Sequence, residues 1–140
     1  MHLRLIFGIH RATHQIGLFI QRGAPGLTQA EAHILCHLHE SGAASVAALH
    51  EAFAHRRSTL TSVLDRLAVA ALIVRESSQT DRRSFIISLT PSGKKKAAKI
   101  HRLLESLEGR VLQASTPRKL EMVTELLQQL EQQASEGTKR

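Results

Sequence analysis

Residues 79–93 read QTDRRSFIISLTPSG, a polar segment followed by a strand-like run and then by the start of a helix. The run at 85–89 is rich in β-branched and aromatic residues, and so is LIVRE at 72–76. Such runs favour β-strands, and their spacing predicts a hairpin with a seven-residue tip at 77–83. The Thr-Pro pair that follows predicts a new helix, because the missing N–H of proline is not needed in a first turn.

The hairpin tip carries three charged residues, Asp81, Arg82 and Arg83. A turn requires no arginine, so the pair predicts contact with an anionic partner. We expect Asp81 to pair with a nearby arginine, because a charge-assisted hydrogen bond would fix the direction of the tip. The three residues are therefore candidate binding residues.

The composition agrees with an anionic partner. The chain has 140 residues, of which 42% are hydrophobic, and this is enough for one domain with a buried core. Its net charge is +7, and residues 56–102 contain eleven Lys and Arg against three acidic residues. A basic excess of this kind favours nucleic acid or an anionic membrane surface as the partner.

Other features narrow the class of protein. The first twenty residues are interrupted by Arg4 and Arg11, and they contain neither a signal-peptide core nor a membrane span. The single cysteine, Cys36, rules out an intramolecular disulfide and fits a reducing cytoplasm. No nucleotide-binding loop or nucleophile elbow is present. We therefore expect a cytoplasmic protein that is not an enzyme, with no cofactor, no metal and no membrane partner.

The helix predicted at 57–70 has two unlike faces. Its apolar residues cluster on one side when residues are spaced about 100° apart: Leu60, Val63, Leu64 and Leu67. The other side carries small polar and charged residues: Ser58, Thr61, Ser62 and Asp65, with Arg66 beside them. Short hydroxyl side chains let a helix approach base edges in the major groove of DNA, while arginines of a hairpin tip are attracted to the neighbouring minor groove.

The remaining segments also favour helices. A capping box of Thr28 and Glu31 predicts a helix that runs to about residue 39, and a shorter helix is expected at 45–53. Narrow apolar seams predict helices at 3–22 and after each Thr-Pro pair, and such seams suit helix pairing. The predicted fold is mainly α with a small β-hairpin wing, in which a winged helix-turn-helix DNA-binding domain occupies 28–93. Dimerisation helices are expected at 1–22 and 95–134, with a frayed tail at 135–140.

These motifs together resemble the multiple-antibiotic-resistance regulator (MarR) family. The resemblance rests on LTQAEAHILCHL and on SVAALHEAFAHRRSTLTSVLDRLAVAALIVRESSQTDRRSFIISLTPSG, in this order and spacing. It implies an obligate homodimer on a roughly palindromic operator, usually a repressor released by a small ligand, oxidant or metal.

The resemblance also assigns residues to two sites. The DNA-binding residues that it implies are Arg57, Ser58, Thr59, Thr61, Ser62, Arg66, Asp81, Arg82 and Arg83. An effector pocket would draw on Ile16, Ile20, His33, Cys36 and His37. The sequence departs from the family pattern at Ala32, at His55 and at Ala71, where the pattern has glycine. A left-handed backbone at Ala71 would cost about 1 kcal/mol.

Three alternatives stay open at this point. His33, Cys36 and His37, with His101 on a later helix, are candidate metal ligands, since some relatives sense zinc through histidines on the second and fifth helices. Cys36 is a candidate peroxide sensor, a role that requires a lowered pKa. The third alternative is a winged-helix module for protein interaction that does not read DNA.

Overall fold

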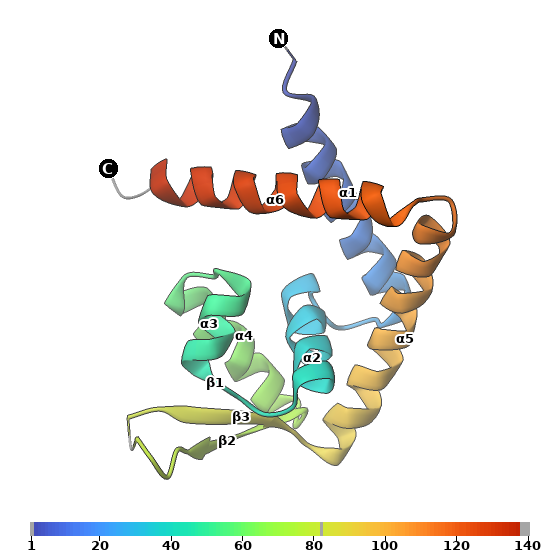
Figure 1. Ribbon diagram of the computed structural model, residues 1–140. Helices are drawn as coiled ribbons and strands as arrows, with labels where there is room; N and C mark the ends of the chain where they lie inside the picture. The colour runs from blue at the N-terminus through green and yellow to red at the C-terminus, as the bar shows by residue number, and fades with distance from the viewer. Residues whose placement is uncertain (1, 82, 138–140) are drawn as a thin grey trace. The chain divides into compact units, whose positions relative to one another are not determined.

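The computed structural model describes residues 2–81 and 83–137. The chain forms two compact units, one up to Leu104 and one from Glu105 onward. Figure 1 shows the order of the elements along the chain. They are α1 (Arg4–Gly23), α2 (Gln29–Ser41), β1 (Ala44–Ser45), α3 (Val46–Phe53), α4 (Arg57–Val69), β2 (Ile73–Ser77), β3 (Phe85–Leu89), α5 (Pro91–Gln113) and α6 (Pro117–Gly137).

The sheet contains one strand more than the predicted hairpin. Strands β2 and β3 pair antiparallel from Ile73 opposite Leu89 to Ser77 opposite Phe85. The two-residue strand β1 pairs with the other edge of β3, which gives the order β1-β3-β2. The expected two-stranded wing is therefore part of a three-stranded sheet, and β3 is its central strand.

The predicted helix starts are confirmed by their caps. The hydroxyl of Thr28 accepts from the Glu31 amide at 3.2 Å, and the Glu31 carboxylate accepts from the Thr28 amide at 2.9 Å. These two bonds form the capping box that opens α2. Ser45 Oγ accepts from the Ala48 amide at 3.0 Å and opens α3. Each cap satisfies amides that have no partner within the helix.

The junction of α4, β2 and α5 is closely fitted. Thr90 Oγ1 donates to the Ala71 carbonyl at 2.6 Å and accepts from the Gly93 amide at 2.9 Å. A Cβ on Gly93 would lie 1.9 Å from the Leu72 carbonyl oxygen, so this position requires glycine. Ala71 has φ +55°, so this alanine adopts the left-handed backbone that favours glycine, in spite of the cost.

One hydrophobic core holds the first unit together. It takes residues from α1, α2, α3, α4, the sheet and the first turns of α5, and includes Ile20, Ile34, Leu35, Leu49, Leu60, Leu64, Leu67, Ile87 and Ile100. The apolar side predicted for α4 is buried as expected, since its four residues are at most 2% exposed. Burial of this side leaves the polar side of α4 in contact with solvent.

The second unit has no comparable core. No residue of α6 is buried, and its large apolar side chains are exposed: Leu120, Met122, Val123, Leu126 and Leu127. The helix extends to Gly137, three residues beyond the expected end of the dimerisation region, and residues 138–140 of the predicted tail lie outside the described part of the chain. Across the described residues, no helix has the length and apolar character to cross a membrane.

Candidate nucleic-acid interface

The exposed side of α4 presents the residues predicted to contact DNA. Arg57, Ser58, Thr59, Thr61 and Ser62 are all exposed. The apolar residues between them turn inward, because positions three and four apart share one face of a helix. The exposed side therefore offers short hydroxyl groups, with an arginine at the first position of the helix.

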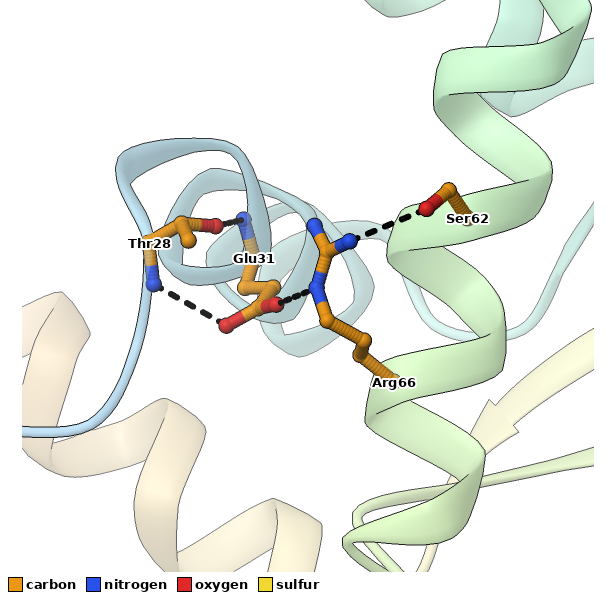
Figure 2. Close-up of polar contacts among 4 residues, drawn as sticks. All are labelled: Thr28, Glu31, Ser62 and Arg66. Atoms are coloured by element: carbon orange, nitrogen blue, oxygen red, sulfur yellow. Dashed lines mark hydrogen bonds and ion pairs between the residues drawn. The ribbon is translucent and has the colours of Figure 1, made fainter.

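Arg66 is held in an ion pair with α2, as Figure 2 shows. Its Nε donates to Glu31 Oε1 at 2.5 Å, and its terminal NH1 donates to Ser62 Oγ at 3.0 Å. The Arg66 side chain remains 51% exposed, whereas that of Glu31 is only 6% exposed. The guanidinium thus joins the N-terminal cap of α2 to the exposed side of α4.

The neighbouring residue, Asp65, binds the wing. Asp65 Oδ1 accepts from Arg75 NH2 on β2 at 2.6 Å. Both side chains keep contact with solvent, so the pair contributes only about 0–1 kcal/mol to stability. The pair nevertheless connects β2, the first strand of the wing, to α4 at the residue that precedes Arg66.

The wing tip is held by local hydrogen bonds. Asp81 Oδ1 accepts from the backbone amide of Arg83 at 3.0 Å. The Asp81 carbonyl accepts from the amide and the hydroxyl of Ser84, at 3.1 and 3.2 Å. The expected pairing of Asp81 with an arginine side chain stays a prediction, and the contact seen within the described residues is with the backbone amide of Arg83. Arg83 is exposed, and the predicted contact residue Arg82 lies outside the described residues.

The five residues predicted to line an effector pocket occupy different environments. Ile20 is completely buried in the core, and Ile16 and Cys36 pack against the core while partly buried. His33 and His37 are half-buried. Burial, and to a lesser extent the nearby His55, lowers the pKa of His33, so this histidine stays neutral at pH 7. An open hollow lies at the start of α1, lined by His2, Arg4, Leu5, Phe7 and Arg11.

The surroundings of Cys36 oppose a role in peroxide sensing. Burial, aided by the nearby Glu40 carboxylate, raises the pKa of the Cys36 thiol to about 11. A sensor thiol needs the opposite shift, because the thiolate is the reactive form. At neutral pH Cys36 is therefore protonated and inert, and it acts as a small apolar residue beside the core.

Two of the candidate metal ligands, His37 and His101, have other partners. His101 Nε2 lies 2.9 Å from Glu40 Oε1, and its ring is 5.1 Å from that of His39. The ring of His37 lies edge-on to Phe53, with 5.4 Å between centroids. Over residues 2–81 and 83–137, no three His, Cys, Asp or Glu side chains are grouped as metal ligands.

Sequence reasoning found the exposed face of α4 but missed two residues that position it, Glu31 and Arg75. Glu31 was predicted only as part of a helix cap, which is a local role. Its bond to Arg66 spans 35 residues of sequence, and helical periodicity gives the direction of a side chain but not its partner. The buried carboxylate and the exposed strand residue thus became visible as site residues only in the structure.

The comparison with protein families supplies the identification. Residues 27–85 match the model of the MarR family. Over these residues the chain is similar to the MarR family. This similarity agrees with the winged-helix fold and the class of transcriptional regulator expected from the sequence. No curated protein matches the chain in sequence.

Solved structures share the fold over nearly the whole chain. A probable transcriptional regulator from Pseudomonas aeruginosa is 23% identical with a TM-score of 0.74, and the match covers 91% of this chain and 97% of that one. BpsR from Bordetella bronchiseptica is 24% identical with a TM-score of 0.72 and coverage of 94% and 96%. A MarR mutant from E. coli, complexed with operator DNA, is 21% identical with a TM-score of 0.74 and coverage of 91% and 94%.

Proposed function

We propose that this protein is a homodimeric repressor that binds a roughly two-fold symmetric operator and is released by a small ligand. The observation that carries the DNA-reading part is the Arg75–Asp65 bond, which joins the wing to α4 at 2.6 Å. Because of this bond, the hydroxyl face of α4 and the exposed Arg83 of the wing belong to one positioned element. Such an element suits the major groove and the adjacent minor groove.

The proposed contacts follow from side-chain chemistry. Ser58, Thr59, Thr61 and Ser62 are short enough to let α4 approach base edges, and Arg57 is placed to bind a phosphate at the edge of the groove. Arg83, and Arg82 beside it in sequence, are the proposed minor-groove residues, with Asp81 holding the tip.

Exposed apolar residues support the homodimer. Large apolar side chains are exposed on α1 at Leu3, Leu5, Ile6 and Phe7, and on α6 at the residues given above. Patches of this kind mark association surfaces, because leaving them in water is unfavourable. Dimerisation through residues 1–22 and 95–134 would place two copies of α4 about 34 Å apart, one turn of DNA.

Two structural relatives support the remaining parts of the proposal. A MarR mutant from E. coli is seen with operator DNA. The structure of BpsR concerns regulation of its DNA binding by 6-hydroxynicotinic acid. We extend both features to this chain, with the effector bound near Ile16, Ile20, His33, Cys36 and His37, and we place this DNA-binding protein in the cytoplasm.

The decisive experiment is selection of an operator from random duplexes, followed by titration of Arg83→Ala against that operator. We expect a two-fold symmetric site with half-sites one turn apart. Arg83→Ala should weaken binding about tenfold or more, because an arginine contact to DNA bases contributes about 1–3 kcal/mol. Arg118→Ala, on the exposed start of α6, is the matched control and should bind as the parent does.

Three outcomes would contradict parts of this proposal. Unchanged affinity of Arg83→Ala at physiological salt would remove the wing from the interface. Recovery of a site without symmetry would argue against the dimer. Binding that does not vary with salt would favour a winged-helix module for protein interaction. The logarithm of the affinity for DNA should fall with the logarithm of the salt concentration, with a slope of about −0.9 for each phosphate contacted.

A further inference from the structure

The carboxylate of Glu31 is a buried anchor with both oxygens in use. Glu31 is 4% exposed. Its Oε2 accepts from the Thr28 amide at 2.9 Å, and its Oε1 accepts from Arg66 Nε at 2.5 Å. A charged carboxylate away from water requires a compensating partner, which here is the guanidinium. Arg66 is therefore held in place by α2 before any DNA is bound.

The geometry of the guanidinium transfers this constraint to Ser62. Its five N–H groups point in fixed directions within one plane, so fixing Nε on Glu31 also fixes NH1. NH1 donates to Ser62 Oγ at 3.0 Å, and Ser62 lies one helical turn before Arg66 in α4. Figure 2 shows the resulting chain of contacts, which runs from Thr28 through Glu31 and Arg66 to Ser62.

This contact favours one hydrogen-bonding role for Ser62 at DNA. A guanidinium has no acceptor, so Ser62 Oγ accepts in the pair with one of its two lone pairs and keeps its own proton. The positive charge beside the remaining lone pair disfavours a second donor there. A serine within a helix otherwise tends to donate that proton to the carbonyl four residues earlier. Because hydrogen bonds in a chain polarise one another, the bond from the charged guanidinium makes the Ser62 hydroxyl a stronger donor toward a further acceptor, such as one on DNA. Ser62 is exposed, so its proton can point away from the protein.

We propose that Arg66 is a positioning residue, fixed by Glu31, that makes Ser62 a hydrogen-bond donor and so selects a base edge bearing an acceptor. The acceptors in the major groove are guanine N7 and O6, adenine N7 and thymine O4. The amino groups of cytosine and adenine are donors and are disfavoured opposite Ser62. This inference rests on the proposed function, because it requires α4 to lie in the major groove.

The test compares operators selected from random duplexes by the parent protein and by Ser62→Ala, Glu31→Gln and Arg66→Lys. Ser62→Ala first identifies the base pair that Ser62 contacts, as the position where preference is lost. Glu31→Gln keeps the side-chain shape and a residue suited to the capping box but removes the charge. Arg66→Lys keeps the charge but removes the planar fork.

We expect Glu31→Gln and Arg66→Lys each to relax the preference at that same base pair, by about three- to tenfold, as befits a single hydrogen bond. The double variant of Glu31→Gln and Ser62→Ala should show no further loss there, since both changes act on one contact. The matched control is Glu40→Gln, which removes a carboxylate from the other end of α2 but leaves Arg66 and Ser62 untouched. It should preserve the preference at this base pair, whereas a general loosening of α2 would not.

The slope of affinity against salt separates the competing roles of Arg66. A positioning residue leaves the slope unchanged in Arg66→Gln, whereas a direct phosphate contact would lower it by about 0.9. A lowered slope with the base preference intact would overturn the proposal. So would relaxation at a base pair that Ser62→Ala does not affect, because Arg66 would then read that base itself.

Two further readouts keep these outcomes interpretable. Thermal unfolding of each variant reports whether it is folded, and Arg66→Lys replaces Glu31→Gln if the buried site tolerates the latter poorly. Failure of the proposed function looks different from failure of this inference. The parent protein would then select no preferred duplex, whereas an error confined to Arg66 would leave the parent operator intact.

Discussion

The core of the first unit and helix α6 of the second treat their apolar side chains in opposite ways. In the first unit, the residues of the hydrophobic core are at most 8% exposed. In the second, the large apolar residues of α6 between Leu120 and Leu127 are 43% to 54% exposed. The first unit is therefore stabilised by contacts within itself, whereas we infer that α6 is stabilised by a second copy of the chain. In the proposed homodimer, reading DNA and association would therefore depend on separate sets of residues.

The largest effect is expected in the core of the first unit. Leu64→Ala removes a side chain that is 2% exposed, between α4 and the rest of the core. The free energy of unfolding should fall by about 2–5 kcal/mol, because both burial and packing are lost. Urea unfolding at several protein concentrations measures the change. A loss that grew on dilution would show that Leu64 acts through association and would contradict its role in an internal core.

A different kind of loss is expected in α6. The double variant Val123→Glu and Leu127→Glu should raise the dissociation constant of the dimer about 100-fold or more, since each buried side chain contributes about 1.5–3 kcal/mol. Sedimentation across a concentration series measures this constant. Gln128→Glu adds a charge at an exposed polar position of the same helix and should leave the dimer intact. A double variant that stayed dimeric would exclude this face of α6 from the interface.

The smallest expected effect is a gain in stability at the end of α4. Ala71→Gly should raise the free energy of unfolding by about 1 kcal/mol, because φ +55° is strained for alanine and not for glycine. Ala70→Gly is the control, since Ala70 has φ −73° and should lose about 0.5–1 kcal/mol. Thermal unfolding measures both variants. Equal effects at the two positions would mean that backbone strain is absent, and neither change should alter the dimer.

Much of the fold was predictable because its signals are local. The capping box of Thr28 and Glu31 and the hydrophobic periodicity of α4 act within a few residues, and both were found where expected. Strand β1 was missed because Ala44 and Ser45 form no strand-like run. They are extended only because β3 lies beside them. Pairing partners of this kind depend on the whole fold, which a short segment does not encode.

In the candidate site, too, local features were predictable and contacts between elements were not. The exposure of Ser58, Thr61 and Ser62 followed from spacing alone. The partners of the charged residues did not, because Arg66 meets Glu31 from another helix. The bond of Asp81 to the backbone amide of Arg83 was not predicted either. Direction on a helix is a local property, whereas the choice among several possible charged partners is settled by tertiary packing.

The strand order β1-β3-β2 also bears on how the protein avoids aggregation. Unpaired edges invite strands of other molecules to extend a sheet. One outer strand is only two residues long, and the other carries Arg75 and Glu76 near the middle of its five residues. Neither edge is a good template for further strand addition. Molecules concentrated side by side on DNA can therefore meet without their wings merging into a continuous sheet.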